Sequence, residues 1–111
     1  MLTKAFIPYK GYYSSPFSRW QSSMANENSI VLGSNTTKRW LASKQWDPKM
    51  FDYLILGVTI GQPKIFYGGP WSAALIGADN IPGLLVSQAC STSTVGIFQA
   101  AMGVETGFCK N

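Results

Sequence analysis

Histidine is absent from the 111-residue sequence, cysteine occurs only twice, and charged residues are scarce. Charged side chains make up 13% of the chain, against roughly 25% in an average soluble domain, whereas hydrophobic residues make up 46%. Without histidine, the chain has no imidazole of its own to offer as a catalytic base. So few charges on a short chain predict that much of its surface is covered by other protein.

Two cysteines are too few for the disulfide framework of a small secreted protein, so Cys90 and Cys109 are expected to be reduced thiols. The start of the sequence, MLTKAFIPYKGYY, lacks the apolar core and the cleavage site of a signal peptide. The longest apolar run, Tyr53–Gly61, falls well short of the roughly 18 residues that a membrane-spanning helix needs. We therefore expect a cytoplasmic protein without a membrane span.

The net charge of +4 comes from nine basic and five acidic residues, and the basic residues are scattered along the chain. No basic run and no basic repeat interleaved with aromatic residues occurs, which argues against nucleic acid as a partner. A mildly basic surface is compatible with a coenzyme that carries phosphates. The length allows one domain with a modest core.

Apolar and turn-forming residues alternate in a pattern that predicts an α/β fold with a parallel sheet. Pro48 is expected to end the first helix, because proline and the residue before it disfavour helical backbone. Asn26 or Asn28 is expected to cap that helix, and Gly107 to end the last one. The expected elements are a strand at Ala5–Tyr13, a loop at Ser14–Met24, a helix at Asn26–Lys44, a strand at Phe51–Gly57, a loop at Val58–Gly69, a helix at Trp71–Gly77, a strand at Gly83–Ser87 and a helix at Thr92–Thr106.

Cys90 lies in the short turn between the last expected strand and the last expected helix. At a helix N-terminus, unpaired N–H groups and the positive end of the helix dipole favour a thiolate, and the same N–H groups can hold an oxyanion. Ser91–Thr94 supplies small hydroxylated residues that suit the first turn. Cys90 is thus a candidate nucleophile, and the alternative is a buried structural thiol. The last helix is apolar nearly all round, which predicts that it is buried.

Three stretches resemble the N-terminal part of the thiolases, a family of acyl-CoA acyltransferases. They are SPFSRW (15–20), DPKMFDYLILG (47–57) and QACSTSTVGIFQAAMGVETG (88–107), and the resemblance runs from Ala5 to near the end of the chain. It implies the N-terminal part of a duplicated βαβαβα fold with a mixed, mainly parallel sheet. Residues 1–111 are then expected to form an incomplete, nucleophile-bearing domain that ends before the next strand of the family.

The resemblance implies that Cys90 is acylated as a thioester and that the acyl group passes to or from coenzyme A. No permanently bound cofactor and no metal is implied. Thiolases activate this cysteine with a histidine and use a second cysteine as acid and base, both from the C-terminal half. The chain alone is therefore expected to be inactive, to need a chain that supplies those two residues, and to have an inert Cys109. The strand Leu84–Ala89 is expected to make the contact of a homo- or hetero-oligomer, and the loop Gly61–Gly69 to shape acyl specificity.

Two alternatives to an acyltransferase stay open. The first is a non-catalytic assembly subunit that keeps the thiolase core, in which Cys90 has no special reactivity. The second is a ketosynthase-like condensing enzyme, which shares the fold and a cysteine at the same helix start. The SPFSRW segment favours a thiolase over a ketosynthase, although on its own it is also typical of a surface loop anchored by Phe17 and Trp20.

Overall fold

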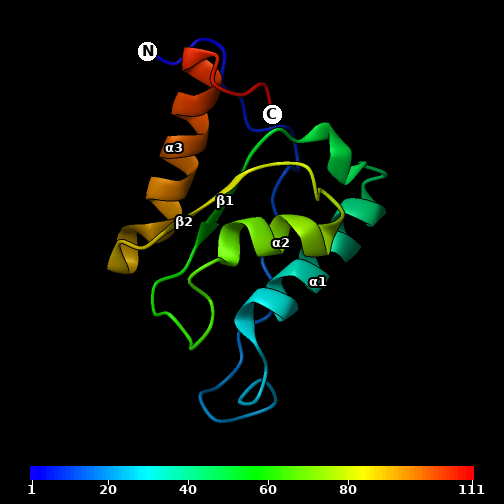
Figure 1. Ribbon diagram of the computed structural model, residues 1–111, viewed down its shortest axis with the longest axis vertical. Helices are drawn as coiled ribbons and strands as arrows, with labels where there is room; N and C mark the ends of the chain where they lie inside the picture. The colour runs from blue at the N-terminus through cyan, green and yellow to red at the C-terminus, as the bar shows by residue number, and fades with distance from the viewer.

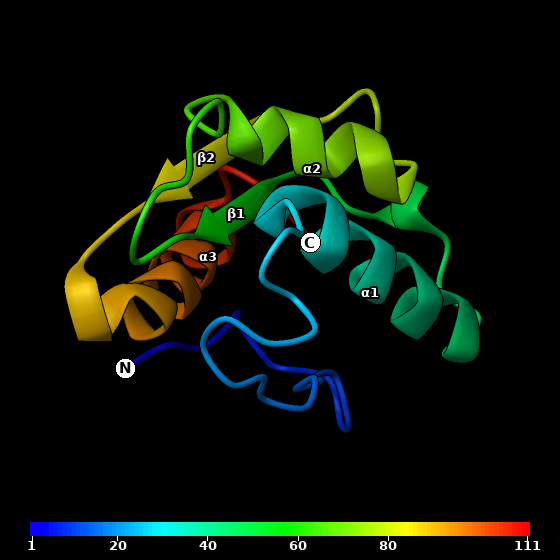
Figure 2. The ribbon, with the colours of Figure 1, turned by 90° about the horizontal axis from the view of Figure 1, so that it is seen from below.

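Two parallel strands, β1 (Leu54–Gly57) and β2 (Gly83–Val86), form the sheet of the computed structural model, which describes residues 1–111 (Figure 1). Helix α2 (Gly68–Ile76) lies between the strands in sequence and covers one face of the sheet, while α3 (Thr92–Thr106) lies on the other face (Figure 2). The expected α/β class with parallel strands is confirmed. β1 begins at Leu54, later than the expected Phe51, because its partner Gly83 follows Pro82, which has no N–H to extend the pairing.

Helix α1 (Ser29–Ser43) packs against α2, and its start follows from local sequence. The side-chain oxygen of Asn28 accepts hydrogen bonds from the N–H groups of Ile30 at 2.9 Å and Val31 at 3.2 Å. Of the two expected caps, Asn28 is therefore the one that the helix uses. After α1, a 3-10 turn (Pro48–Met50) leads the chain into β1. Leu41 packs with Ile76 and Ala78 to form a buried core between α1 and α2.

The backbones of α2 and β2 approach each other closely at two glycines. A Cβ atom at Gly83 would lie 2.5 Å from the carbonyl carbon of Gly69, and a Cβ atom at Gly69 would lie 2.8 Å from that of Gly83. The sequence places Gly68 and Gly69 in a loop, whereas in the structure they open α2 ahead of the expected Trp71. They do so because the missing side chains let the first turn of α2 rest directly on β2.

The expected strand at Ala5–Tyr13 is not formed. The carbonyl of Pro8 accepts a hydrogen bond from the N–H of Gly11 at 2.7 Å, and Lys10 has a left-handed φ of 56°, so the chain turns here. Pro8 also has no N–H to donate to a neighbouring strand. The sheet therefore has two parallel strands instead of the larger, mixed sheet that was expected.

The expectation that the last helix is buried is wrong for this chain. Thr92 is the one buried residue of α3, whereas Ile97 and Phe98 are 57% and 59% exposed. A sheet of two strands is too narrow to cover a helix with apolar side chains on most sides. The bounds Thr92–Thr106 nevertheless match the prediction, and Gly107, with a φ of 80°, ends the helix as expected.

The carboxylate of Glu105, near the C-terminal end of α3, holds the first residues of the chain (Figure 1). One of its oxygens accepts hydrogen bonds from the N–H of Thr3 at 2.7 Å and from the Thr3 hydroxyl at 2.8 Å. The other oxygen accepts from the N–H groups of Lys4 at 2.9 Å and Ala5 at 3.2 Å. These bonds, that of the Lys4 N–H foremost and those of Thr3 next, lower the pKa of the Glu105 carboxyl from 4.5 to about 2.

We expect the anchoring of the N-terminal residues by Glu105 to depend on pH. Because the pKa is lowered in the folded state, the ionised carboxylate stabilises the anchor fully above about pH 4.5 and ceases to do so as the pH falls through about 2. The amide proton shifts of Thr3 and Lys4 should therefore titrate with a midpoint near 2. Glu105→Gln has one oxygen for two pairs of donors, so it should release part of the segment at neutral pH. A midpoint at the ordinary carboxyl value, or unchanged shifts in the variant, would contradict the anchor.

Candidate functional site

Cys90 is exposed in a 3-10 turn (Ala89–Ser91) that leads from the end of β2 into α3. The N–H of Ser91 donates to the carbonyl of Gln88 at 2.9 Å and closes the turn. Ala89 has a φ of 46°, a left-handed conformation that costs a non-glycine residue about 1–2 kcal/mol. The turn presents the thiol at the N-terminal end of α3, so the alternative of a buried structural thiol is wrong.

Thr92 braces this turn with its buried hydroxyl. The hydroxyl oxygen accepts the N–H of Gln88 at 2.8 Å and the hydroxyl donates to the carbonyl of Ala89 at 2.7 Å. Thr92 is only 4% exposed, so these two hydrogen bonds are partly protected from competition by water. They hold both residues that precede Cys90 and thereby support the strained conformation of Ala89. Thr92 is therefore a positioning residue for the thiol.

Two residues at the end of β1 complete the support of the turn. A Cβ atom at Gly57 would lie 2.9 Å from the Cγ2 atom of Thr92, so glycine is needed to let the Thr92 methyl group approach the strand. The hydroxyl of Thr59 donates to the carbonyl of Ala89 at 3.3 Å, and the hydroxyl of Ser87 donates to the carbonyl of Thr59 at 3.3 Å. The sequence alone identifies Thr92 only as one of several capping hydroxyls and does not identify Gly57 as its partner. A glycine at the end of a strand indicates in the sequence that another residue packs closely there, but it does not identify that residue.

No side chain caps the N-terminus of α3, which begins directly after Ser91. The expected capping role of Ser91–Thr94 is therefore wrong, because the Thr92 hydroxyl faces back to the turn. The first-turn N–H groups of an α-helix have no intrahelical acceptor, and the helix dipole makes this end positive. The N–H groups of Ser91 and Thr92 already donate to the carbonyls of Gln88 and Ala89, so an oxyanion next to Cys90 would be stabilised mainly by the positive end of the helix dipole.

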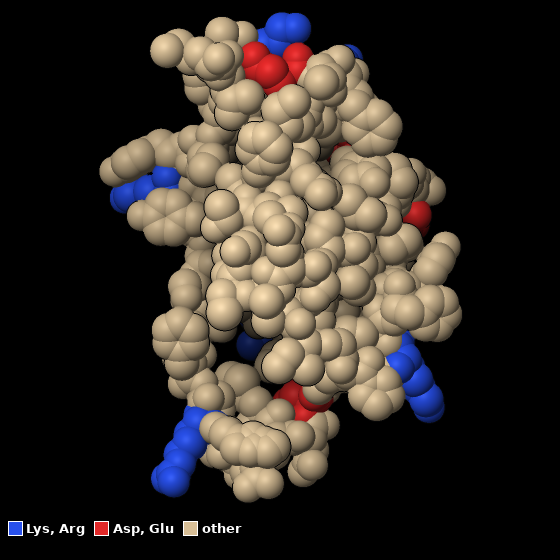
Figure 3. Space-filling view, turned by 90° about the vertical axis from the view of Figure 1, so that its left-hand side faces the viewer, with Lys and Arg blue, Asp and Glu red and all other residues tan.

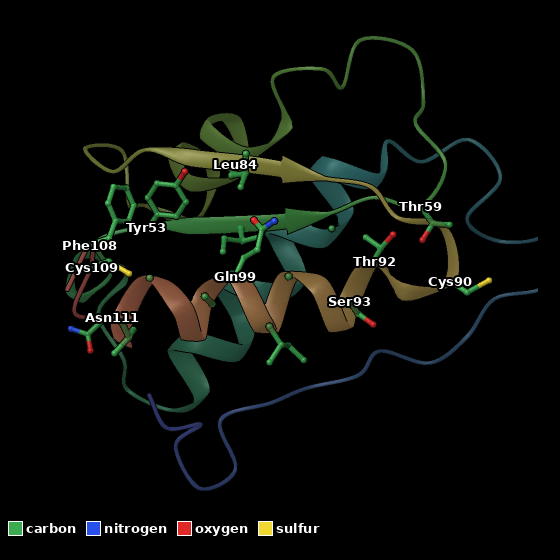
Figure 4. A pocket seen from close by; sticks show the side chains of 17 residues that line it. Tyr53, Thr59, Leu84, Cys90, Thr92, Ser93, Gln99, Phe108, Cys109 and Asn111 are labelled. Atoms are coloured by element: carbon green, nitrogen blue, oxygen red, sulfur yellow. The ribbon is translucent and has the colours of Figure 1, made fainter. Parts of the chain in front are cut away.

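An open groove of about 670 Å³ runs beside α3 and starts at Cys90 (Figure 4). Cys90, Thr59, Thr92 and Ser93 lie at one end, and Phe108, Cys109 and Asn111 lie at the other, with Leu84 and Gln99 between them. One wall is α3, and the other is formed by β1 and β2. The residues in the middle are mainly apolar or small. They include Ile55, Leu84, Gly96, Ile97, Ala100 and Val104.

Cys109 lies at the far end of the groove from Cys90 and is half-buried. Its N–H donates to the carbonyl of Gly103 at 3.2 Å, and a Cβ atom at Gly103 would lie 2.9 Å from its sulfur. The two thiols are both free, and they sit in different surroundings. The structure does not bring Cys109 to Cys90, so it gives Cys109 no position from which to act on a group attached there.

The resemblance gave expected roles to three other segments of the chain. No residue of the loop Ser14–Met24 lines the groove, and Phe17 and Trp20 are 100% and 74% exposed, so they do not anchor the loop. The segment Leu84–Ala89 contains most of β2, whose outer edge is unpaired because β1 is its one neighbour. The loop Gly61–Gly69 borders a separate hollow of about 270 Å³ with Leu85 and Ser87.

The face that carries α3 is mostly uncharged, with basic and acidic side chains at its margins (Figure 3). No three histidine, cysteine, aspartate or glutamate side chains are grouped so that they could hold a metal ion. None of the helices combines the length and the apolar character that crossing a membrane requires. The chemistry that this surface offers is therefore that of a thiol, hydroxyls and backbone N–H groups beside an apolar groove.

Comparison with known proteins does not assign the chain to a family. No protein-family model matches the chain, and no curated protein matches it.

Proposed function

We propose that this chain is the nucleophile-bearing part of a thiolase-type acyltransferase and that Cys90 accepts an acyl group from an acyl-CoA. The observation that carries the proposal is the exposed thiol in a braced turn directly before α3, whose N-terminus no side chain caps. The resemblance of residues 88–107 to the active-site segment of the thiolases supports the same role. Of the two thiols, Cys90 is the exposed one and lies at the N-terminal end of a helix.

The proposed step is a thioester exchange without oxidation or reduction. The Cys90 sulfur attacks the acyl carbonyl carbon, the bond from that carbon to the coenzyme A sulfur breaks, and the thiol proton ends on coenzyme A. The positive end of the α3 dipole stabilises the oxyanion that develops on the carbonyl oxygen. Thr92 keeps Cys90 in position through Gln88 and Ala89. The acyl group then leaves Cys90 for coenzyme A or for a carbanion acceptor.

Complete turnover needs groups that this chain does not contain. The thiolase mechanism uses a histidine to activate the nucleophile and a second cysteine as acid and base, and the chain has no histidine. We propose that a further segment or a partner chain supplies both groups. The exposed apolar side of α3, with Ile97 and Phe98, and the unpaired edge of β2 at Leu84–Ala89 are the surfaces that such protein would cover. The chain alone is expected to form the thioester slowly and not to turn over.

A non-catalytic assembly subunit is the second candidate function. The observation in its favour is the large exposed apolar surface, which includes Phe6, Phe17, Trp20, Ile97 and Phe98. Surfaces of this kind mark sites of protein association. In this case Cys90 would be as unreactive as Cys109.

The intact mass of the purified chain after incubation with an acyl-CoA tests the proposal. We expect one acyl adduct on the unmodified chain and on Cys109→Ala, and no adduct on Cys90→Ala, because the exposed thiol is the nucleophile. Cys109→Ala is the matched control, since it removes the other thiol of the same groove. An adduct that persists in Cys90→Ala, or no adduct together with equal alkylation rates at the two thiols, would refute the proposal and favour the assembly subunit.

A further inference from the structure

We infer that Thr59 is a catalytic residue of the Cys90 site, whose hydroxyl donates a hydrogen bond to the oxyanion that forms when the thiol attacks an acyl carbonyl. This role rests on the proposed acylation of Cys90. The N–H groups of Ser91 and Thr92, which follow the thiol in the chain, already donate to backbone carbonyls of the turn. Neither of them is free for an oxyanion, so a donor from another element of the site would add to the effect of the helix dipole.

The carbonyl oxygen of Ala89 has more hydrogen-bond donors than it can fully use. The Thr92 hydroxyl donates to it at 2.7 Å, the Thr92 N–H closes the 3-10 turn onto the same oxygen, and the Thr59 hydroxyl donates at 3.3 Å. A carbonyl oxygen has two lone pairs, so one of the three donors is in excess. Thr59 is that donor, because its bond is the longer of the two hydroxyl bonds and is exposed to competing water.

Two other hydrogen bonds hold the backbone of Thr59 without help from its hydroxyl. The N–H of Val58 donates to the carbonyl of Val86 at 3.0 Å, which continues the pairing of β1 with β2. The Ser87 hydroxyl donates to the carbonyl of Thr59 at 3.3 Å. The Thr59 hydroxyl can therefore change its acceptor by rotation, while the residue itself stays at the end of the sheet.

Thr59 and Cys90 lie at the same end of the groove (Figure 4). In a planar trans peptide the Ala89 carbonyl oxygen lies about 2.8 Å from the Cα atom of Cys90, so the Thr59 hydroxyl, 3.3 Å from that oxygen, lies within about 6 Å of this Cα atom. A cysteine side chain with an attached carbonyl group spans such a distance. The Cys90 sulfur points out of the groove in Figure 4, but Cys90 is exposed, so rotation about its Cα–Cβ bond turns the sulfur toward Thr59.

During acylation the Thr59 hydroxyl exchanges one acceptor for another, and no proton is transferred. As the Cys90 sulfur bonds to the acyl carbon, negative charge develops on the carbonyl oxygen, which becomes a stronger acceptor than the uncharged carbonyl of Ala89. Thr92 keeps the Ala89 carbonyl paired after Thr59 has turned away. When the bond from the acyl carbon to coenzyme A breaks, the oxyanion disappears. The new hydrogen bond is therefore strongest near the transition state, which lowers the barrier.

Acylation and alkylation of Cys90 separate this role from simple support of the turn, because only acylation passes through an oxyanion. Thr59→Val keeps the shape of the side chain and removes the hydroxyl. We expect it to slow acylation by acetyl-CoA on the full chain by at least about tenfold, less than the usual cost of one oxyanion donor because the site is open to water. The rate of alkylation by iodoacetamide should stay unchanged. Thr59→Ser keeps the hydroxyl and should restore most of the acylation rate.

Ser93→Ala is the matched control. Ser93 carries another hydroxyl at this end of the groove, but Figure 4 shows it pointing away from Thr59. Both rates at Cys90 should therefore equal those of the unmodified chain. Equal slowing of acylation and alkylation in Thr59→Val would show that Thr59 only supports the turn, and an unchanged acylation rate would show that the hydroxyl is not used. Either result would overturn the inference.

An activated ester separates failure of this inference from failure of the proposed function. p-Nitrophenyl acetate acylates a thiol without recognition of coenzyme A and releases p-nitrophenol. If acetyl-CoA gives no adduct, the proposed function fails, and the ester is then applied to Cys109→Ala, in which Cys90 is the one remaining thiol. Adding Thr59→Val should again slow acylation and not alkylation, and Thr59→Ser should restore it. Equal effects on the two reactions would overturn the inference independently of coenzyme A.

Discussion

Gly83→Ala is expected to destabilise the protein by about 3 kcal/mol, the upper end of the usual cost of overpacking. The new Cβ atom would lie 2.5 Å from the carbonyl carbon of Gly69 and 2.7 Å from the nitrogen of Pro70. Both atoms belong to the backbone of α2, so no side chain can rotate away, and the helix itself must move off β2. Denaturant unfolding should show a lower midpoint with an unchanged slope. A loss of this size is a large part of the roughly 5–15 kcal/mol that stabilises a typical domain.

Gly33→Ala is the control for the loss of glycine itself. Gly33 lies in the middle of α1, and no atom lies within 4 Å of the position of its Cβ atom. The free energy of unfolding should therefore rise by about 0.5–1 kcal/mol, the helix preference of alanine over glycine. If Gly83→Ala is no less stable than Gly33→Ala, the close approach of α2 and β2 is not needed for folding.

Thr92→Val is expected to cost about 1–2 kcal/mol of stability, since it leaves the partly buried N–H of Gln88 without its acceptor. The shape of the side chain stays nearly the same, so the loss reports on the hydroxyl and not on a cavity. Without the two hydrogen bonds, only the Thr59 hydroxyl and the N–H of residue 92 still donate to the Ala89 carbonyl, so the left-handed Ala89 and the adjacent Cys90 are held less firmly. We expect acylation of Cys90 to slow by at least about tenfold, because small displacements of a reacting group are costly.

Thr92→Ser and alkylation of Cys109 distinguish positioning from general loss of structure. Serine keeps the hydroxyl and gives up the methyl group that contacts Gly57, so it should restore most of the acylation rate at Cys90. The alkylation rate of Cys109, at the far end of the groove, should stay the same in both variants. Equal acylation rates in Thr92→Val and Thr92→Ser, or parallel changes at Cys109, would show that the brace does not position the nucleophile.

The ends of the helices were predictable from the sequence because they depend on neighbouring residues. Asn28 caps α1 through N–H groups two and three residues away, and Gly107 ends α3 because it adopts a positive φ at low cost. The same local reasoning placed Cys90 between a strand and a helix, and it identified the parallel α/β class from the alternation of elements. These features need no knowledge of distant contacts.

The features that the sequence did not predict depend on contacts between residues that are distant in the sequence. The sequence of Ala5–Tyr13 suits a strand, but it forms a turn, and the residues just before it are held by Glu105 at the other end of the chain. Likewise, α3 has the composition of a buried helix, yet its exposure depends on how many strands lie against it.

By itself, the sequence determined the three helices, the two strands of the sheet, their order and the place of Cys90 before α3. Only the tertiary structure decided that Thr92 braces the Cys90 turn against Gly57 and that small residues of α3 face the sheet across a groove. The physical reason is the distance along the chain over which each kind of interaction acts. Caps and periodicity act over one or two turns of chain, whereas packing and cavities depend on which residues far apart in the sequence are brought into contact.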